Sequence, residues 1–302
     1  MTNAPMPKEF EVALLKHLKK FYLPSATKET PWGRKDNSYF ARGIVRLNEA
    51  FTTNRTDGTG NYFHDPLMRS GYLAYFLPVN AMKAASVFHK IMPLLPKKRV
   101  KVLDIGSGPL SMVFGYLFYL QSINKTHKIP SEIEVYAVEQ NEKILKDGIT
   151  LLQTYLEASG LAKKLKVKIV PIVDNALKFR SKEKDFDLIC MGNFLNEIQE
   201  RQKQSEYLME TLARFSNEKT VVFMLEPAFK KISRDLQSLR DEMIEQTTFR
   251  VVAPCLHQLT CPLNLIAKGD WCHFMQAWTI PTFIKDFDQI TGLKKLIFCI
   301  PI

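Results

Sequence analysis

The sequence lacks any long apolar run, and no stretch reaches the roughly 18 residues that a membrane-spanning helix needs. Its opening segment, MTNAPMPKEFEVALLKHLKK, carries acidic side chains early and has no clean apolar core of the kind found in signal peptides. We therefore expect no signal peptide, no membrane partner and a cytosol-like, cytoplasmic compartment, which would be the mitochondrial matrix if the source is eukaryotic. These absences leave the oligomeric state open.

Cysteine is scarce, with five residues in a chain of 302, and none of the five stands in the C-x-x-C spacing of a zinc ribbon. In a reducing compartment such residues are expected to be thiols or metal ligands rather than disulfide partners. We interpret Cys190 and Cys299 as buried strand residues, because apolar runs surround both.

Three cysteines nevertheless gather in one irregular stretch, APCLHQLTCPLNLIAKGDWCHF, which spans residues 253–274. The flanking prolines and glycine predict a loop, which can wrap a metal as a helix or strand cannot. Thiolates hold iron–sulfur clusters at varied spacings, whereas zinc accepts three cysteines and one histidine. The alternative is that these thiols are small buried side chains. The metal-ligand candidates are Cys255, Cys261 and Cys272, with His257 and His273 among them.

Acidic residues are too few to balance the basic ones, and the net charge is +11. The excess is uneven: residues 1–99 hold 16 Lys and Arg against 7 Asp and Glu, whereas residues 100–302 hold 26 against 24. A polyanion such as RNA suits a basic region of this kind, and the alternative is a solvated surface. The predicted RNA contacts are Arg34, Lys35, Arg42, Arg46 and Arg55, interleaved with the aromatic residues Trp32, Tyr39, Phe40 and Phe51.

The chain has no internal repeat and no low-complexity segment, and its pattern changes at about residue 100. Before that point we expect a basic, mainly helical region, residues 1–99, with a loop at TNRTDGTGN and a later helix broken or kinked at Pro78. After it, strand-like and helical runs alternate over 100–302, which predicts an α/β domain with a doubly wound, mostly parallel sheet and helices on both faces. The expected strands are 100–106, 132–139, 166–173, 186–195, 220–227 and a last one at 293–302.

The first strand of this domain leads into a glycine turn, VLDIGSGPL, in which Ser111 replaces the third glycine of a dinucleotide fingerprint. That replacement argues against a pyrophosphate on the helix N-terminus. Gly106 and Gly108 still allow a ligand to approach the backbone closely. The second strand ends in Glu139, where a carboxylate would accept both ribose hydroxyls of a nucleoside. Asp174 follows the third strand, where a side chain would meet an adenine amine.

Together these features resemble the class I S-adenosylmethionine-dependent methyltransferase fold over residues 100 to about 227. The resemblance implies that S-adenosylmethionine is the cofactor and that the first-strand glycines make room for its amino-acid end. The alternative is a doubly wound domain that binds no cofactor or another nucleotide. The cofactor-binding residues carried over are Asp104, Gly106, Gly108, Glu139 and Asp174.

The segment after the fourth strand, GNFLNE, lacks the Asn-Pro-Pro-aromatic turn that many methyltransferases of base amines carry. Without the prolines the turn takes another shape, so the pattern does not assign the catalytic residues. Asn193, Asn196 and Glu197 are the candidates, and the last two serve equally well as helix caps. Methyl transfer needs little acid–base help once the nucleophile is aligned, so the missing motif does not exclude catalysis.

The cysteine stretch, APCLHQLTCPL followed by DWCHF, resembles the signature of the methyltransferase-like family of small-ribosomal-subunit assembly proteins, which has mitochondrial members and bacterial relatives. The segments YLAYFLPVNA and GNFLNEI fit that pattern too, so the similarity spans roughly residues 70 to 300. The resemblance implies a 4Fe-4S cluster with Cys255, Cys261 and Cys272 as ligands. The family's fourth cysteine follows the segment that here reads LKKLIFCIPI. The fourth ligand is therefore open between Cys299, His257, His273 and an exogenous group.

Three functions follow from these patterns. The first is an rRNA-directed methyltransferase of the small ribosomal subunit, which binds the rRNA or an assembly intermediate. The second is a non-catalytic assembly factor that binds rRNA and carries a structural iron–sulfur cluster, and the missing catalytic motif favours it. The third is a small-molecule methyltransferase with a structural zinc, against which the basic N-terminal region argues.

Overall fold

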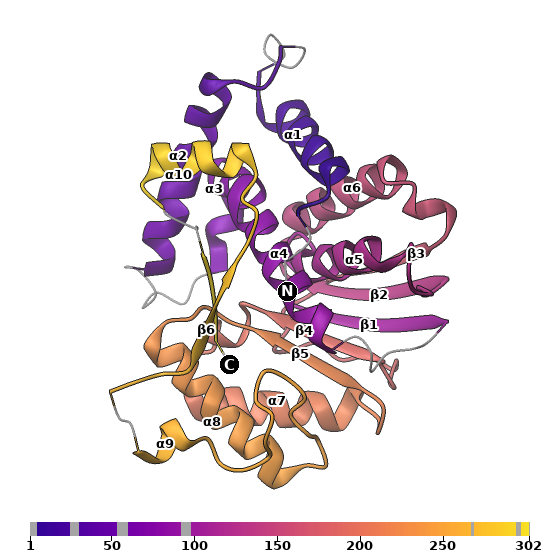
Figure 1. The fold of residues 1–302 in the computed structure, drawn as a ribbon, viewed down its shortest axis with the longest axis vertical. Coiled ribbons are helices and arrows are strands. Elements are labelled where there is room, and N and C mark those ends of the chain that lie inside the picture. Colours follow the sequence, from indigo (N-terminus) through magenta and orange to yellow (C-terminus); the bar gives the residue numbers. More distant parts are fainter. Residues whose placement is uncertain are drawn as a thin grey trace.

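The computed structural model describes residues 5–24, 30–52, 60–91, 98–266, 269–293 and 297–301. Its centre is a five-stranded parallel sheet with the strand order β3-β2-β1-β4-β5 (Figure 1). This order runs outward from β1 in both directions, so the predicted doubly wound α/β fold is confirmed. The strands are β1 (Arg99–Ile105), β2 (Glu132–Glu139), β3 (Lys166–Val173), β4 (Leu188–Gly192) and β5 (Val221–Leu225).

Helices cover both faces of this sheet, and alternate strand residues divide between the two faces. Val102 and Val135 join one hydrophobic cluster with residues of α5 and α6. Leu103 and Ile189 lie in a second cluster with residues of α7 and α8. Figure 1 shows the two pairs of helices on opposite sides of the strands. The helices are α5 (Ser111–Ile123), α6 (Glu142–Ala158), α7 (Arg201–Phe215) and α8 (Lys230–Gln246).

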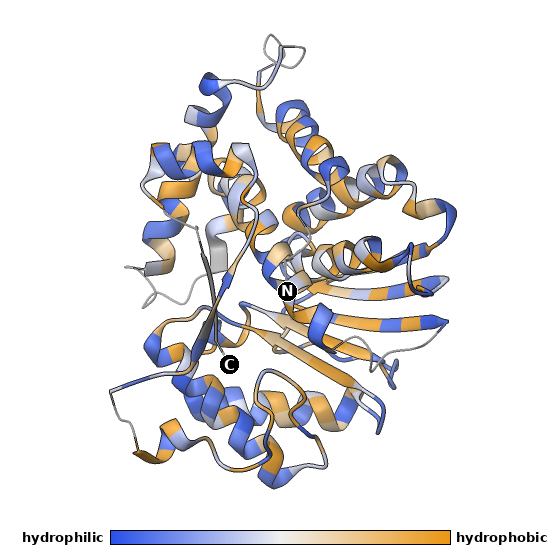
Figure 2. Ribbon diagram, in the orientation of Figure 1, coloured by the Kyte–Doolittle hydropathy of each residue, from blue (hydrophilic) through white to orange (hydrophobic). Residues whose placement is uncertain are grey.

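The second face is only half covered, because the connection between β3 and β4 contains no helix. That connection, residues 174–187, is described throughout and consists of turns and irregular chain. Its ring Phe179 stacks on Phe215 of α7, and its ring Phe186 packs edge-on against Tyr136 of β2. The amino-terminal ends of β2 and β3 stay open: the Lys168 side chain there is 55% exposed. Figure 2 shows this contrast, with hydrophobic colour along the strands and hydrophilic colour at the free ends of β1 and β2.

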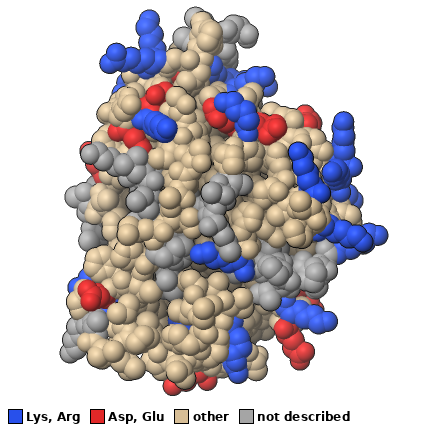
Figure 3. All heavy atoms as spheres, viewed as in Figure 1, with Lys and Arg blue, Asp and Glu red and all other residues tan. Residues whose placement is uncertain are grey.

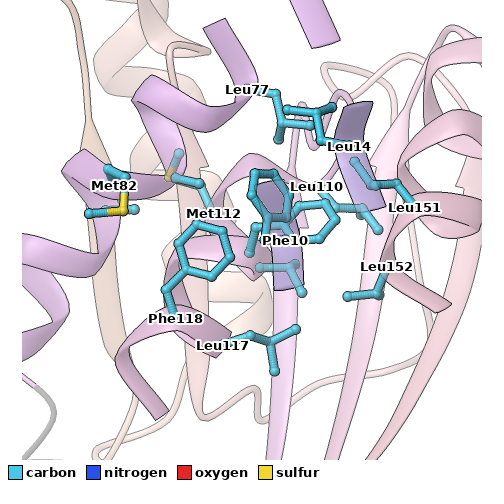
Figure 4. Packing of buried hydrophobic residues seen from close by; sticks show 14 of the residues in the cluster. Phe10, Leu14, Leu77, Met82, Leu110, Met112, Leu117, Phe118, Leu151 and Leu152 are labelled. Carbon is cyan, nitrogen blue, oxygen red and sulfur yellow. The ribbon is translucent and has the colours of Figure 1, made fainter. Parts of the chain in front are cut away.

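The N-terminal helices share a hydrophobic core with the sheet domain. The ring of Phe10 lies 5.0 Å from that of Phe114 and 4.8 Å from that of Phe118, both on α5. Figure 4 shows Phe10 and Leu14 packed among residues from α4, α5 and α6, so one cluster extends across residue 100. The elements of this region are α1 (Lys8–Tyr22), α2 (Arg34–Thr52), η3 (Gly60–His64), α3 (Pro66–Gly71), η4 (Tyr72–Phe76) and α4 (Leu77–Ile91).

A buried polar cluster attaches the same helices to α6. The Asp147 carboxylate accepts a hydrogen bond from the Tyr22 hydroxyl, and His17 Nε2 lies 3.3 Å from it. Arg69 donates to the Tyr22 hydroxyl at 2.9 Å and to the Phe63 carbonyl at 2.8 Å. Its guanidinium also lies 3.3 Å from the Asp147 carboxylate. Arg69, a basic residue of the first third of the chain, therefore stabilises the interior and does not face a partner.

Two helical features differ from the sequence-based expectations. Sequence patterns did not predict α2, although its buried residues Phe40 and Ile44 recur at helical spacing, because polar residues surround them. The kink expected at Pro78 is a π-helical turn, η4, just before the proline, and the Leu77 N–H donates to the Tyr72 carbonyl there.

Most of the TNRTDGTGN loop lies outside the described residues. Among the described helices, none is long and apolar enough to cross a membrane.

A separate two-stranded antiparallel sheet consists of β6 (His273–Ala277) and β7 (Ile297–Pro301). The expected last strand corresponds to β7. β6 was not expected, because its first residues read as the end of the cysteine-rich loop. Two helices complete the chain: α9 (Pro262–Ile266) and α10 (Thr282–Thr291).

Two glycines allow α2 and α3 to touch. A Cβ at Gly43 would lie 2.1 Å from the Leu67 carbonyl oxygen, and one at Gly71 would lie 2.5 Å from the Gly43 carbonyl carbon. We expect Gly71→Ala to force the helices apart and to lower the free energy of unfolding by about 1–3 kcal/mol, measured by urea denaturation. Gly269→Ala is the control, because its added methyl would meet no atom within 4 Å. An equal midpoint for both variants would contradict the close approach.

Candidate functional site

The turn after β1 places two glycines in left-handed backbone conformations, with φ of 65° at Gly106 and 50° at Gly108. A Cβ at Gly106 would lie 2.6 Å from the Phe194 ring, so this glycine makes room for one of the chain's own side chains. A Cβ at Gly108 would meet no atom within 4 Å. The backbone at Gly108 therefore faces open space that a ligand can enter.

Glu139, at the end of β2, holds this turn in place. Its Oε2 accepts a hydrogen bond from Gly108 N at 3.0 Å, and its Oε1 accepts one from Asn141 N at 2.8 Å. One buried carboxylate thus joins the glycine turn to the start of α6. Burial raises the pKa of Glu139, and the backbone hydrogen bonds partly offset that shift. Each oxygen has a second lone pair, so both can still accept a ribose hydroxyl.

Asp104, near the end of β1, is fully buried, and among the described residues neither of its carboxylate oxygens has a hydrogen-bond partner. Burial, and after it the charge of Glu139, raises the pKa of Asp104 to about 8. The hydroxyl of Ser107 is also buried without a partner in the described structure. Buried polar groups in native proteins are nearly always paired, so these two point to a ligand that supplies the missing contacts.

Glu226, which follows β5, shapes the turn after β4. Its buried carboxylate accepts from Phe194 N at 3.1 Å, from Leu195 N at 2.8 Å and from Asn196 Nδ2 at 2.6 Å. Burial raises the pKa of Glu226 to about 7. The candidate Asn196 therefore has its amide nitrogen bound inside the protein, and the candidate Asn193 adopts a left-handed φ of 55°. Sequence reasoning missed Glu226, although its place after a strand, in MLEP, is the signal that identified Glu139.

Two tyrosines bring the N-terminal region to the same edge of the sheet. The Tyr62 hydroxyl donates to Glu197 Oε1 at 3.2 Å. Burial raises the pKa of Glu197 to about 7, although the residue retains an exposed surface that weakens the shift through screening by water. Burial also raises the pKa of Tyr72 to about 12. No sequence pattern links these tyrosines to a site, because only the tertiary fold brings them there.

Asp174 lies at this edge beside Glu139. Its backbone N–H donates to the Glu139 carbonyl at 3.2 Å, which places the two residues side by side. The Asp174 side chain is exposed, and its Oδ1 accepts from Asn175 N at 2.7 Å. Its carboxylate is therefore accessible to a ligand that reaches past the end of β3.

Acidic groups thus converge at the carboxyl-terminal edge of the sheet, and the charge of Glu139 shifts the pKa of two of the other acids. Its charge adds to burial in raising the pKa of both Asp104 and Glu197. A buried acid without a described partner, Asp104, beside other carboxylates and open space suits a ligand that carries positive charge and hydroxyl groups. S-adenosylmethionine has a sulfonium, an ammonium and a ribose, so the residues at this edge fit that cofactor.

The cysteine segment brings three thiols to one region beside α8. Cys261 is buried, and Cys255 and Cys272 are half-buried. Burial raises the pKa of Cys272, and the charges of Cys255 and Cys261 raise it further, so both lie within electrostatic range of Cys272. Across the described ranges, no three Cys, His, Asp or Glu side chains close around one metal position. The donor set has the chemistry for a soft metal, and convergence on a single metal stays a prediction.

The candidates for a fourth ligand occupy different positions. His257 Nδ1 accepts from Leu259 N at 3.2 Å, which leaves its Nε2 to face a ligand. His273 is exposed at the start of β6, and its ring stacks on Trp271 with centroids 5.6 Å apart. Cys299 lies in β7, and its side chain is outside the described residues.

Arg240 and Asp241 of α8 hold the cysteine segment against the domain. Arg240, which is 6% exposed, donates to the carbonyls of His257 at 2.7 Å and Leu259 at 2.8 Å. Both Asp241 carboxylate oxygens lie 3.0 Å from Cys261 N, which donates to them. The two side chains also form an ion pair at 2.5 Å. The chain's own contacts therefore shape the loop around Cys261, and no sequence motif identifies this pair.

The basic residues predicted to contact RNA lie mainly on α2. Arg46 pairs with Asp65 at 2.7 Å, and the guanidinium of Arg42 lies over the Tyr39 ring at 5.2 Å. The interleaved rings also have partners: Trp32 stacks on Phe40 with centroids 5.5 Å apart. The exposed members of the set are Arg34, Lys35, Arg42 and Arg46, and Arg55 lies outside the described residues. Phe51 packs edge-on against Tyr62 at 5.3 Å.

The comparison with protein families covers the glycine turn, the acidic edge and the cysteine segment together. Residues 92–282, more than half of the chain, match the family model of the mitochondrial small ribosomal subunit protein Rsm22. The chain belongs to the Rsm22 family. No curated protein matched the Rsm22-family chain in a direct sequence search.

Three solved structures resemble this Rsm22-family chain weakly. YcgJ from Bacillus subtilis has 12% identity and a TM-score of 0.33, over 54% of this chain and 58% of its own. A methyltransferase from Methanosarcina mazei has 18% identity and a TM-score of 0.32, over 51% and 64%. The chain thus spans less than two thirds of the length of each. A putative class I methyltransferase from Listeria monocytogenes has 12% identity and a TM-score of 0.40, over 80% of both. The strand order, and not these superpositions, identifies the fold.

The Arg240–Asp241 contacts predict how the cysteine segment responds to substitution. Arg240→Met keeps the length of the side chain but removes donors to two carbonyls, and hydrogen bonds to charged groups contribute about 1.5–3 kcal/mol each. We expect the loop to open and Cys261 to react with iodoacetamide at least about tenfold faster, with the sheet domain still folded. Lys231→Met, which removes a surface ion pair on the same helix, is the control. Unchanged Cys261 reactivity in Arg240→Met would contradict the anchoring role.

Proposed function

We propose that this Rsm22-family protein binds S-adenosylmethionine at the carboxyl-terminal edge of its sheet and acts on small-subunit rRNA during ribosome assembly. One observation carries the cofactor half: the buried Asp104 carboxyl has no described partner and lies in the strand that leads to the open space at Gly108. Family membership supports the role in assembly of the small ribosomal subunit, and it supports the mitochondrial matrix as the compartment.

Each part of the cofactor has a partner in this proposal. Asp104 would face a cationic group of the amino-acid end, and the backbone at Gly108 would lie against it. Glu139 would accept from the ribose hydroxyls, and Asp174 would accept from the adenine amine. When bound, S-adenosylmethionine supplies an activated methyl group for an electron-rich atom of a base, and its sulfur keeps the electron pair of the broken bond.

The chain's own residues would shape the acceptor side. Glu226 fixes the turn after β4, and the Tyr62–Glu197 hydrogen bond connects that turn with the N-terminal region. A base amine that gains a methyl group loses a proton. Glu197, with its pKa raised above the usual value for glutamate, can take up that proton at a carboxylate oxygen.

One observation favours a second function, that of a non-catalytic assembly factor. The Asn196 amide nitrogen donates to Glu226 at 2.6 Å and is therefore not directed at a substrate. In such a protein the cofactor would stabilise the fold, and the surface would bind rRNA. Incubation of the protein with methyl-labelled cofactor and small-subunit rRNA distinguishes the two functions, because only the enzyme transfers the label.

The proposal extends to a structural metal held by the cysteine segment. Three thiols near one another suit an iron–sulfur cluster, with zinc as the alternative, and Arg240 and Asp241 would hold the loop in a receptive shape. We expect protein purified without oxygen to contain iron and acid-labile sulfide, or zinc, in stoichiometric amount. The triple variant Cys255→Ser, Cys261→Ser, Cys272→Ser should lose the metal, and Cys190→Ala, in strand β4, should keep it. A metal-free wild-type protein would overturn this part alone.

Ligand binding at the cofactor site should change the protonation of Asp104, and calorimetry can measure this change. With a pKa of about 8, Asp104 is mostly protonated at pH 7 in the free protein. A bound ammonium favours the ionised carboxylate, so binding of S-adenosylhomocysteine at pH 7 should release a proton. That release appears as a binding enthalpy that depends on the ionisation enthalpy of the buffer.

We expect Asp104→Asn to abolish this buffer dependence and to weaken binding about 10- to 100-fold, since a hydrogen bond to a charged group contributes about 1.5–3 kcal/mol. Glu245→Gln, an exposed substitution on α8, is the control and should bind as the wild type does. The cofactor proposal fails if the wild type does not bind the ligand, or if Asp104→Asn binds with the same affinity and the same proton release.

A further inference from the structure

Basic residues are concentrated at the amino-terminal edge of the sheet, at the opposite end of the strands from the cofactor site. Four segments at this edge together hold 11 Lys and Arg against 5 Asp and Glu, which is more than half of the net charge of +11. Figure 3 shows Lys and Arg side chains along the margin of the molecule where β1 to β3 begin. The segments are residues 98–101, 124–134, 163–168 and 181–187.

Backbone hydrogen bonds join these segments into one surface. Ser131 N donates to the Lys98 carbonyl at 2.8 Å, and Lys166 N donates to the Ser131 carbonyl at 2.9 Å. Asp187 N donates to the Lys101 carbonyl at 2.8 Å. The charges are therefore distant in sequence but adjacent in space, so a count along the chain does not reveal them.

The exposed face of the sheet at the amino-terminal ends of β2 and β3 continues this surface. Glu132 lies between Arg99 and Lys166 in the strand register and forms ion pairs with them at 3.2 and 3.3 Å. The next row repeats the arrangement, and Glu134 pairs with Lys168 at 2.5 Å. In the first row one carboxylate lies between two cations, so that row retains a positive charge, whereas in the second row Lys101 also pairs with Glu183 at 2.6 Å.

The loops that border these two rows carry lysines that differ from those in the rows, because they have no described acidic partner. Lys125, Lys128, Lys163 and Lys164 are exposed, and within the described residues none of them forms an ion pair. Exposed cations without acidic partners keep their full charge for a polyanion. By contrast, basic residues of the N-terminal region include Arg69, which is buried against Asp147, and Arg46, which pairs with Asp65.

We propose that the amino-terminal edge of the sheet is the main surface that binds the phosphate backbone of rRNA, an inference that rests on the proposed rRNA-directed function. Each lysine that neutralises a phosphate releases a counterion, and this release drives association. The edge lies a strand length away from Asp104 and Gly108, so RNA held there does not compete with the cofactor. The surface contacts backbone and not base edges, so it positions the protein without reading sequence.

The experiment compares two variants that remove the same charge from different places. One replaces Lys125, Lys128, Lys163 and Lys164 by Gln. The matched control replaces the exposed residues Arg34, Lys35, Arg42 and Arg46 by Gln. Binding of transcribed small-subunit rRNA is measured by filter retention over a series of salt concentrations, and binding of S-adenosylhomocysteine by calorimetry verifies the fold.

The edge variant should flatten the plot of log affinity against log salt by about 0.7–0.9 per lost contact, or about 3 for four contacts. Its affinity at low salt should fall at least about tenfold, and the α2 control should change the slope much less. Cofactor affinity should match the wild type in both variants.

Two results overturn the inference and leave the proposed function intact. In the first, the wild type binds rRNA and the edge variant keeps the wild-type slope, which would mean that the lysines are a solvated surface and do not contact the RNA. In the second, both variants flatten the slope equally, so binding follows net charge and not this surface. A third result, a wild type without salt-dependent rRNA binding, overturns the inference together with the rRNA-directed function.

Discussion

The buried carboxylate of Glu139 is the constraint on which the candidate cofactor site depends. It accepts from Gly108 N and from Asn141 N, so the turn after β1 and the helix after β2 keep their places relative to each other. The same charge, after burial, raises the pKa of Asp104 and of Glu197. Replacement of Glu139 would therefore alter backbone geometry and the protonation of its neighbours together, and its loss cannot be read as the loss of one ligand contact.

The sequence was most informative where a residue's role follows from its place along a strand. β2 and β3 begin and end at the predicted residues, because charged and apolar residues alternate over the first half of each strand and loops bound both. Glu139 and Asp174 were identified as strand-end residues by the same logic. Tyr62, Arg240 and Asp241 could not be found in this way. Their partners lie far along the chain or in a loop without regular structure, and only tertiary packing brings them together.

The two ends of the sheet differ in chemistry. At the carboxyl-terminal edge, the buried Asp104 carboxyl without a described partner and the open space at Gly108 suit a small cationic ligand. At the amino-terminal edge, exposed lysines suit an extended polyanion. The N-terminal helices contribute to the first edge through the Tyr62–Glu197 hydrogen bond and share their core with α5. Much of the positive charge that the sequence places in that region thus lies in helices that pack on the sheet domain.

Strand β3 is an edge strand, with its outer backbone groups not paired within the five-stranded sheet. Strands in this position are templates on which a second copy of a chain can add its own strand, and proteins commonly oppose this with lysine. Lys166 and Lys168 lie on β3, and Lys163 and Lys164 precede it. Two copies that approached edge to edge would bring these like charges together. The same lysines thus oppose aggregation through the edge of the sheet.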